Sequence, residues 1–265
     1  MDHVSAPTVL APGIAVLRAD NPSEMTLDGT NTYLLFAPEA SLAPGTPVIV
    51  IDPGPELEEH LRALAVYDVQ LVLITHRHPD HTGGIDRLRE LTGAPVRAAL
   101  EQFCRGAQVF ADLEAIEAAG TGVRVEFTPG HTSDSVCFVR TGREEHLFTG
   151  DTVLGRGTTI LEHPDGTLFD YLASLERLLG LPDMPLHPAH GEQHQRSHPL
   201  LEGYLAHRED RLNQVRAALE KLGKAGADAR PAELLDLVYP DLDPRLAGAA
   251  SHSLEAQLHY LSRTV

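Results

Sequence analysis

The feature that most constrains this chain is the stretch 71–84, where an apolar run leads directly into a dense group of metal-ligating side chains. Residues 71–74 have the length and branching of a buried strand. They are followed by the pattern His-x-His-x-Asp-His, and residues 85–91 carry apolar side chains at helical spacing. Open α/β sheets place ligand sites at the ends of their strands. The stretch therefore predicts a metal site for zinc or, in another geometry, iron or manganese.

Composition limits the class of protein. The chain has 265 residues, of which 42% are apolar, enough for one large α/β domain with at most a small addition. No stretch approaches the roughly 18 uninterrupted apolar residues of a membrane helix, and residues 1–7 lack the pattern of a signal peptide. Two cysteines, Cys104 and Cys137, cannot form a disulfide framework. We therefore expect a cytoplasmic protein without a membrane partner.

The net charge also bears on the partners of this protein. It is −17 at pH 7, and a strongly acidic surface repels polyanions at long range, so we expect no specific DNA binding. Bound divalent cations would offset part of this charge locally. The charge thus weakens an interpretation as a nucleic-acid-binding protein without excluding it.

Strand-like and helix-like segments alternate up to about residue 195 and then give way to helices. Strands are expected at 14–18, 31–36, 48–52, 71–74, 96–98, 123–127, 136–140 and 146–150, and helices at 56–67, 85–91, 100–104 and 168–179. Three further helices are expected at 204–222, 231–238 and 246–261. We predict two domains, a catalytic domain at 1–195 and a small helical domain at 196–265.

Further polar residues stand where apparent strands end: Asp52, His131, Asp151 and His190. Together with the first cluster, they give seven candidate metal ligands: His76, His78, Asp80, His81, His131, Asp151 and His190. Seven ligands are too many for one tetrahedral ion and suit two. The remaining histidines lack this context and are expected to be surface or packing residues. Of these, His163, His187 and His194 lie nearest to the candidate loops.

The order of these ligands resembles that of the metallo-β-lactamase superfamily, over roughly residues 14–195. The resemblance implies an α/β (α+β) fold, an αββα sandwich with two metals at one edge. It assigns His76, His78 and His131 to the first metal, Asp80, His81 and His190 to the second, and Asp151 to both. Asp52 resembles the family's aspartate that orients the histidine loop, although an aspartate before Pro-Gly also suits a turn.

The resemblance bears on the reaction as well. Zinc lactamases that carry a cysteine at the ligand position of Asp151 are not matched, whereas glyoxalase II and RNA-processing members are similar. We expect two Zn²⁺ ions, with iron or manganese as alternatives, to generate a hydroxide nucleophile. Asp80 is the candidate catalytic residue, since its carboxylate could accept or relay the proton of the water. No separate general acid can be assigned.

A closer resemblance is to the beta-lactamase-like protein 2 family, carried by residues 27–34, 150–159 and 204–208, and the tail is similar to that family's winged-helix domain. Characterised relatives include an endoribonuclease, so the resemblance implies phosphodiester cleavage of single-stranded RNA. A glyoxalase II-like thioesterase, or a hydrolase of another small ester, is the alternative. A catalytically inactive, metal-bound nucleic-acid-binding module is an alternative from another class.

The tail and the substrate loops carry further expectations. The tail has only two lysines, Lys221 and Lys224, and little room for a two-stranded wing, so we expect it to cap the site or to form a homodimer. Arginines 208, 211 and 216 could form a basic stripe, although such residues are more often a solvated face. Candidate substrate contacts, taken from the matched loops, are Asn31, Arg156, Thr158 and Thr159.

Overall fold

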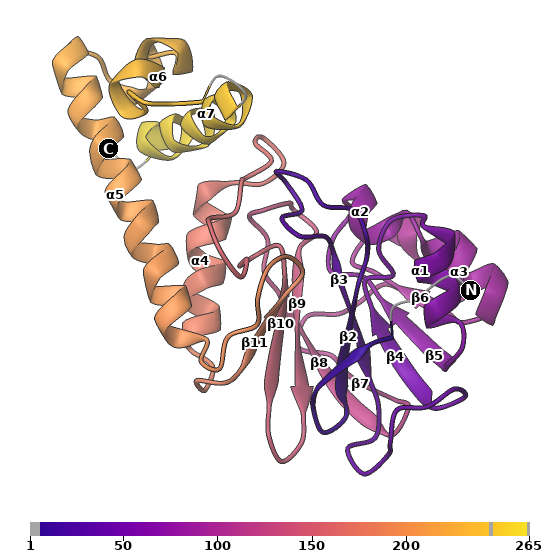
Figure 1. Cartoon of the computed structure of the whole chain (residues 1–265). Coiled ribbons are helices and arrows are strands. Elements are labelled where there is room, and N and C mark those ends of the chain that lie inside the picture. The colour runs from indigo at the N-terminus through magenta and orange to yellow at the C-terminus, as the bar shows by residue number, and fades with distance from the viewer. Residues whose placement is uncertain (1–5, 244–245, 264–265) are drawn as a thin grey trace. The chain divides into compact units, whose positions relative to one another are not determined.

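The computed structural model describes residues 6–243 and 246–263 (Figure 1). The chain divides into two compact units, which are described separately. The sandwich unit comprises residues up to 127, 134–157 and 184–195, and the helical unit comprises 128–133, 158–183 and 196 onward. The segments 128–133 and 158–183 thus belong to the same compact unit as the tail helices. The consecutive domains 1–195 and 196–265 stay a prediction.

Two sheets form the sandwich unit (Figure 1). The first has the strand order β1 (Thr8–Ala11), β2 (Ile14–Arg18), β3 (Asn31–Leu35), β4 (Pro47–Ile51), β5 (Asp68–Leu73) and β6 (Val96–Arg97). The second has the order β11 (Leu186–Pro188), β10 (His146–Gly150), β9 (Val136–Thr141), β8 (Thr121–Phe127) and β7 (Ala115–Ala118). Neighbours are antiparallel except β4–β5, β5–β6 and β10–β11, which are parallel.

Side chains alternate between the two faces of the first sheet and so contribute to two hydrophobic cores. One set of side chains fills the space between the sheets, where Tyr33 of the first sheet contacts Phe148 of the second at 5.0 Å between ring centroids. The opposite face of the first sheet packs on α1 (Glu58–Leu64) and α3 (Ile85–Thr92), through residues such as Leu61 and Leu88. The predicted α/β architecture with two sheets is confirmed.

The sequence-based expectations missed several short elements of the described chain, among them the strands β1, β7 and β11 and the helix α2 (Pro79–Thr82). β1 and β7 are edge strands with largely exposed residues, so their hydrophobic alternation is weak. β11 has three residues and ends in Pro188. α2 is a single turn that begins with proline, and its sequence Pro-Asp-His-Thr has no apolar residues at helical spacing. A 3-10 turn, η1 (Glu101–Phe103), stands where a short helix is expected.

A pair of buried histidines joins β10 and β11. Nδ1 of His146 lies 2.9 Å from Nε2 of His187, and the His187 ring stacks on Phe148 at 4.8 Å. These two histidines are packing residues, one of the two roles expected for them. Burial, and secondarily the neighbouring His146, lowers the pKa of His187 to about 3. His187 is therefore neutral in the folded protein at and above about pH 5.

This histidine gives the stability of the sandwich unit a pH dependence. A histidine whose pKa is lowered by folding contributes its full stability above the unfolded pKa, near 6.5, and loses it as the pH falls toward 3. We expect the His187 contribution to the free energy of unfolding to fall by about 2 kcal/mol between pH 7.5 and pH 5.0. Urea titrations of wild type and His187→Gln at both pH values measure it, with His252→Gln as an exposed control. An equal loss in wild type and His187→Gln would contradict the prediction.

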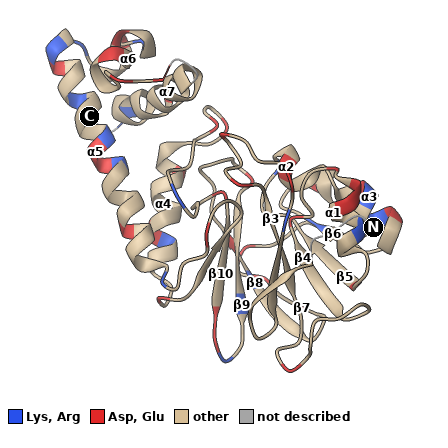
Figure 2. Cartoon of the chain, viewed as in Figure 1, with Lys and Arg blue, Asp and Glu red and all other residues tan. Residues whose placement is uncertain are grey.

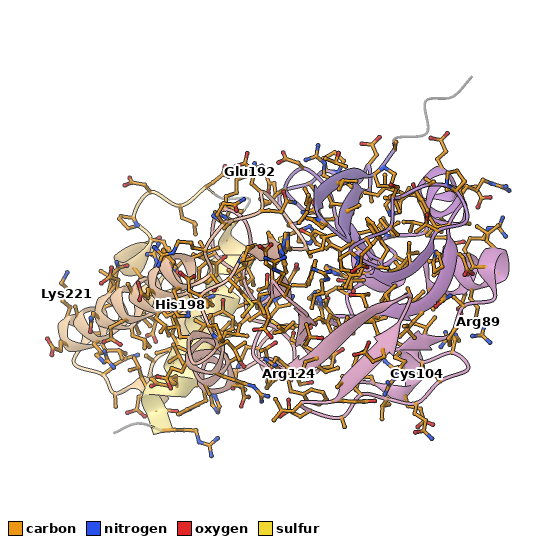
Figure 3. All side chains as sticks on the ribbon, turned by 90° about the horizontal axis from the view of Figure 1, so that it is seen from below. Arg89, Cys104, Arg124, Glu192, His198 and Lys221 are labelled. Atoms are coloured by element: carbon orange, nitrogen blue, oxygen red, sulfur yellow. The ribbon has the colours of Figure 1, made fainter. Side chains whose placement is uncertain are left out.

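The helical unit contains α4 (Leu168–Leu179), α5 (His198–Leu222), η2 (Gly226–Asp228), α6 (Pro231–Val238) and α7 (Ala247–Arg263). Thr167 caps α4 by accepting a hydrogen bond from the Asp170 amide at 3.1 Å. His198 and Lys221 mark the two ends of α5 (Figure 3). Residues 196–243 and 246–263 contain no strand, so the structure gives no support for a wing in the part of the tail that it describes. None of the described helices has the length and apolarity needed to cross a bilayer.

The arginines of α5 do not form a continuous basic stripe. Arg208 is buried, Arg211 lies 4.7 Å above the Tyr239 ring, and Arg216 pairs with Glu209 at 3.1 Å. Acidic residues are interspersed with the basic ones along the helix (Figure 2). The helix thus presents mixed charges, which is a poor surface for a polyanion.

Candidate metal centre

The loops that leave several strands of the sandwich unit meet at one edge of it. β4 and β5 are parallel neighbours, so Asp52, which follows β4, lies beside Thr75, which follows β5. Asp151 directly follows β10, and His190 follows the parallel strand β11. Parallel pairing therefore places these residues together although they are far apart in sequence.

Asp52 anchors the histidine loop. Its backbone is in the left-handed region with φ +53°, and its carboxylate is almost fully buried. One oxygen accepts the Thr75 amide at 2.8 Å, and the other accepts the Thr75 hydroxyl at 2.7 Å and lies 2.8 Å from Nδ1 of His81. An aspartate that orients the histidine loop is expected to make these contacts. An aspartate that only forms a turn before Pro-Gly would not need them.

The seven predicted ligands gather in two groups. In each group, one potential ligand atom per residue lies within 4.8 Å of all the others. The groups are His76, His78, His131 and Asp151, and Asp80, His81 and His190. This is the division that the resemblance implies, with Asp151 in the first group.

Asp151 also reaches the second group. Its Oδ1 lies 3.3 Å from Nε2 of His190 and 3.7 Å from Nε2 of His81, while its Oδ2 lies 3.8 Å from Nε2 of His76. Oδ2 of Asp80 lies 3.2 Å from the same His190 nitrogen. The Asp151 carboxylate thus presents one oxygen to each group, as a bridging ligand would.

Hydrogen bonds orient the imidazole rings from behind. Nδ1 of His76 lies 3.0 Å from the Thr75 hydroxyl, and Nδ1 of His190 lies 3.3 Å from the Gly29 carbonyl. Nδ1 of His131 lies 2.6 Å from the Ile160 carbonyl. With Nδ1 donating, the lone pair is on Nε2, which is the arrangement typical of histidines that bind a metal.

The donor set fits divalent cations. Nε2 of His81 and of His190 is buried and makes no hydrogen bond, although carboxylate oxygens lie 3.2 to 3.7 Å away. Buried nitrogens without a hydrogen bond are costly unless a cation binds them. Imidazole and carboxylate are ligands of zinc, iron and manganese alike. The cluster is therefore suited to divalent metal ions, and its chemistry alone does not select one.

The charges of the cluster interact strongly. Burial opposes ionisation, but the Asp151 carboxylate outweighs it and raises the pKa of His190 to about 9. The same balance raises the pKa of His81 and lowers that of Asp151 well below its usual range. Buried carboxylates thus require positive charge beside them, which protons or metal ions can supply.

The predicted substrate contacts have other partners in the structure. Asn31 is buried, and its amide nitrogen donates to the carbonyls of Pro188 and Gly191, both at 3.0 Å, so it holds the loop of His190. Arg156 is exposed and forms a two-pronged ion pair with Asp28, at 2.9 and 3.1 Å. These contacts give Asn31 a positioning role in the His190 loop. Roles of Asn31 and Arg156 in substrate binding stay predictions.

The two threonines differ from each other. Thr158 is exposed, whereas Thr159 is buried and its carbonyl accepts a hydrogen bond from Arg208. The sequence interpretation missed two residues, Thr75 and Thr30. The Thr75 hydroxyl donates to Asp52, and the Thr30 hydroxyl donates to Asp80 at 3.4 Å. Thr75 immediately precedes the first ligand, and this position was the available signal. Nothing in the sequence around Thr30 indicates its contact.

Comparisons with known proteins agree with this geometry. The model of the metallo-beta-lactamase superfamily matches residues 25–190. The chain belongs to this superfamily. An atrochrysone carboxyl ACP thioesterase from Aspergillus fumigatus is 33% identical, over 90% of this chain and 77% of the relative. A beta-lactamase-like protein 2 homolog from Drosophila melanogaster is 30% identical, over 99% of this chain and 91% of the relative.

Solved structures show the same fold. A beta-lactamase domain protein from Burkholderia ambifaria has a TM-score of 0.79 at 21% identity, covering 99% of this chain and 89% of its own. A metallo-beta-lactamase family protein from Thermus thermophilus has a TM-score of 0.74 at 24% identity, covering 96% and 94%. These two structures show the fold alone. The family match and the sequence relatives make the protein a metal-dependent hydrolase of the metallo-beta-lactamase superfamily, as its ligand order predicts.

Proposed function

We propose that this metallo-beta-lactamase superfamily protein hydrolyses an acyl thioester at a site that holds two divalent cations. The position of Asp151, with one oxygen toward each ligand group, carries the two-metal part of the proposal. The name of the thioesterase relative supports the substrate class. Zinc is the expected metal because the site is rich in histidine, with iron or manganese as alternatives.

The first cation would be held by His76, His78 and His131, the second by Asp80, His81 and His190, with Asp151 common to both. Divalent cations in such a site supply Lewis acidity, which activates water as a nucleophile and stabilises negative charge on the carbonyl oxygen. Thr75, Asp52 and the backbone carbonyls behind the rings keep the imidazoles in the tautomer that this requires.

Asp80 is the residue placed to handle the proton of the nucleophile. Its side chain is 25% exposed, compared with 12% for Asp151, so it is the carboxylate closer to the entering substrate. The Thr30 hydroxyl donates to Oδ2, which leaves Oδ1 of Asp80 to accept a proton from water. Burial would raise the pKa of Asp80, but in the metal-free protein the charge of His81 outweighs it and lowers this pKa. A bound cation would supply the same positive charge and keep the carboxyl ionised.

The leaving group favours a thioester over RNA. A thiol has a pKa of about 8.5, so a thiolate departs near neutral pH without a proton donor, whereas a ribose alkoxide needs a general acid. The net charge of −17 also opposes the approach of a polyanion. The expectation of RNA cleavage therefore ranks second. The cytoplasmic location and the homodimer likewise remain proposals.

A side-by-side assay tests the substrate class. Metal-loaded protein is given a medium-chain acyl-coenzyme A, S-lactoylglutathione and a single-stranded RNA under the same conditions. We expect thioester turnover that exceeds cleavage of RNA by at least about 100-fold in kcat/KM, a difference of about 2.7 kcal/mol. RNA cleavage with intact thioesters would reverse the ranking. Tight RNA binding without turnover of any substrate would favour the catalytically inactive module.

A further inference from the structure

A cavity of about 660 Å³ opens in the sandwich unit at the end opposite to the ligand groups. Strand β10 relates the two places, because His146, its first residue, lines the cavity and Asp151 directly follows its last residue. At about 3.3 Å per residue in a strand, the five steps between them span roughly 16 Å. The cavity is therefore distinct from the candidate metal centre.

Arg140 enters this cavity from between the sheets. Side chains alternate along β9, and Val136 and Phe138 belong to the core between the two sheets. Arg140 continues the same face, so its guanidinium lies in the mouth of the sandwich and is only 5% exposed. A β-carbon on Gly13, in the turn of the other sheet, would lie 3.0 Å from Nη2 of Arg140. The absence of a side chain at Gly13 makes room for the guanidinium.

This buried cation lacks an acidic partner among the described residues. Its Nε donates to the Thr121 hydroxyl at 3.3 Å, a long hydrogen bond, and no described carboxylate forms an ion pair with it. Glu39 and Glu144 act on it only at longer range, and both are exposed at the rim. Burial accordingly lowers the pKa of Arg140. A buried guanidinium without an anion is costly, and a bound anion would remove that cost.

We propose that the cavity binds a small molecule through one oxyanion, a carboxylate or a phosphate, held by the Arg140 guanidinium. The planar fork of a guanidinium matches both groups with two parallel hydrogen bonds. The volume lies in the usual range of small-molecule sites. The exposed glutamates at the rim repel polyanions, so they restrict the ligand to a small one with a single anionic group. This site does not depend on the proposed thioesterase activity.

Calorimetric titration of the metal-loaded protein tests the site, with inorganic phosphate and propionate as the probes. We expect at least one probe to bind wild type and to bind Arg140→Met at least tenfold more weakly. Arg143→Met is the matched control, because Arg143 lies exposed at the rim of the same cavity, and its affinity should stay within about threefold. Any phosphate that binds at the metal centre remains in all three proteins and cancels in the comparison.

Each outcome of this titration has one meaning. Loss of phosphate binding alone in Arg140→Met identifies a phosphate site, and loss of propionate binding alone identifies a carboxylate site. Arg140→Lys keeps the positive charge but lacks the planar guanidinium, so it should bind the probe with intermediate affinity. This variant replaces Arg140→Met if Arg140→Met does not fold. Identical isotherms of wild type and the Arg140 variants for both probes would overturn the proposal.

Discussion

Replacing Asp151 with alanine is expected to abolish hydrolysis and to lower the bound metal from about two equivalents to one or fewer. The side chain presents one oxygen to His190 and the other to His76, so its removal takes a ligand from both groups. Because the two proposed cations would supply both the nucleophile and the stabilisation of the carbonyl oxygen, we expect a loss of at least about 10³-fold in kcat, or about 4 kcal/mol. Metal analysis of the purified protein and a thioester assay measure the two effects.

Two controls separate this role from a general structural one. Asp151→Asn keeps the shape of the side chain but removes its charge, so it should also lose metal while retaining the thermal midpoint of the metal-free protein. Asp28→Ala removes an exposed carboxylate that pairs with Arg156, and it should retain both metal ions. Two equivalents of metal with normal turnover in Asp151→Ala would refute the two-metal site.

The parts of the fold that could be predicted are those written in local patterns. The helices α4 and α6 have the bounds expected from sequence, because Thr167 caps the first and Pro231 stands in the first turn of the second. Candidate ligands such as His76 and Asp151 stood out for the same reason, since they follow the apolar runs 71–74 and 146–150, whereas His190 follows β11, a strand that the sequence did not predict. Edge strands such as β1 and β7 carry no comparable pattern.

The contacts that support the ligands could not be predicted in this way. Asn31 holds carbonyls that lie 157 and 160 residues further along the chain, and only the folded sheets bring them together. Arg140 is the last residue of the strand expected at 136–140, and its inward direction depends on the register of β9 between its neighbours. Sequence patterns thus identified the chemical groups. Tertiary packing decides which of these side chains face a binding site and which hold a neighbouring residue in place.

Within the helical unit, Arg208 links the tail to a predicted metal ligand. It is 4% exposed, its guanidinium lies 4.8 Å above the Tyr171 ring, and Nη2 donates to the Thr159 carbonyl. The next carbonyl, that of Ile160, lies 2.6 Å from Nδ1 of His131. The arginine on α5 thus fixes the segment whose backbone orients the imidazole of His131.

Replacing Arg208 with glutamine should therefore weaken the binding of one metal ion by about 10- to 100-fold, the usual effect of removing a partner that orients a ligand. Chelator competition measures the two dissociation constants, and we expect only one of them to rise. Arg211→Gln is the matched control, since Arg211 lies one turn further along α5 and stacks on Tyr239. Arg208→Lys should restore little, because lysine lacks the planar fork that reaches the carbonyl while covering the ring. Equal metal affinities in Arg208→Gln and Arg211→Gln would show that α5 does not orient His131.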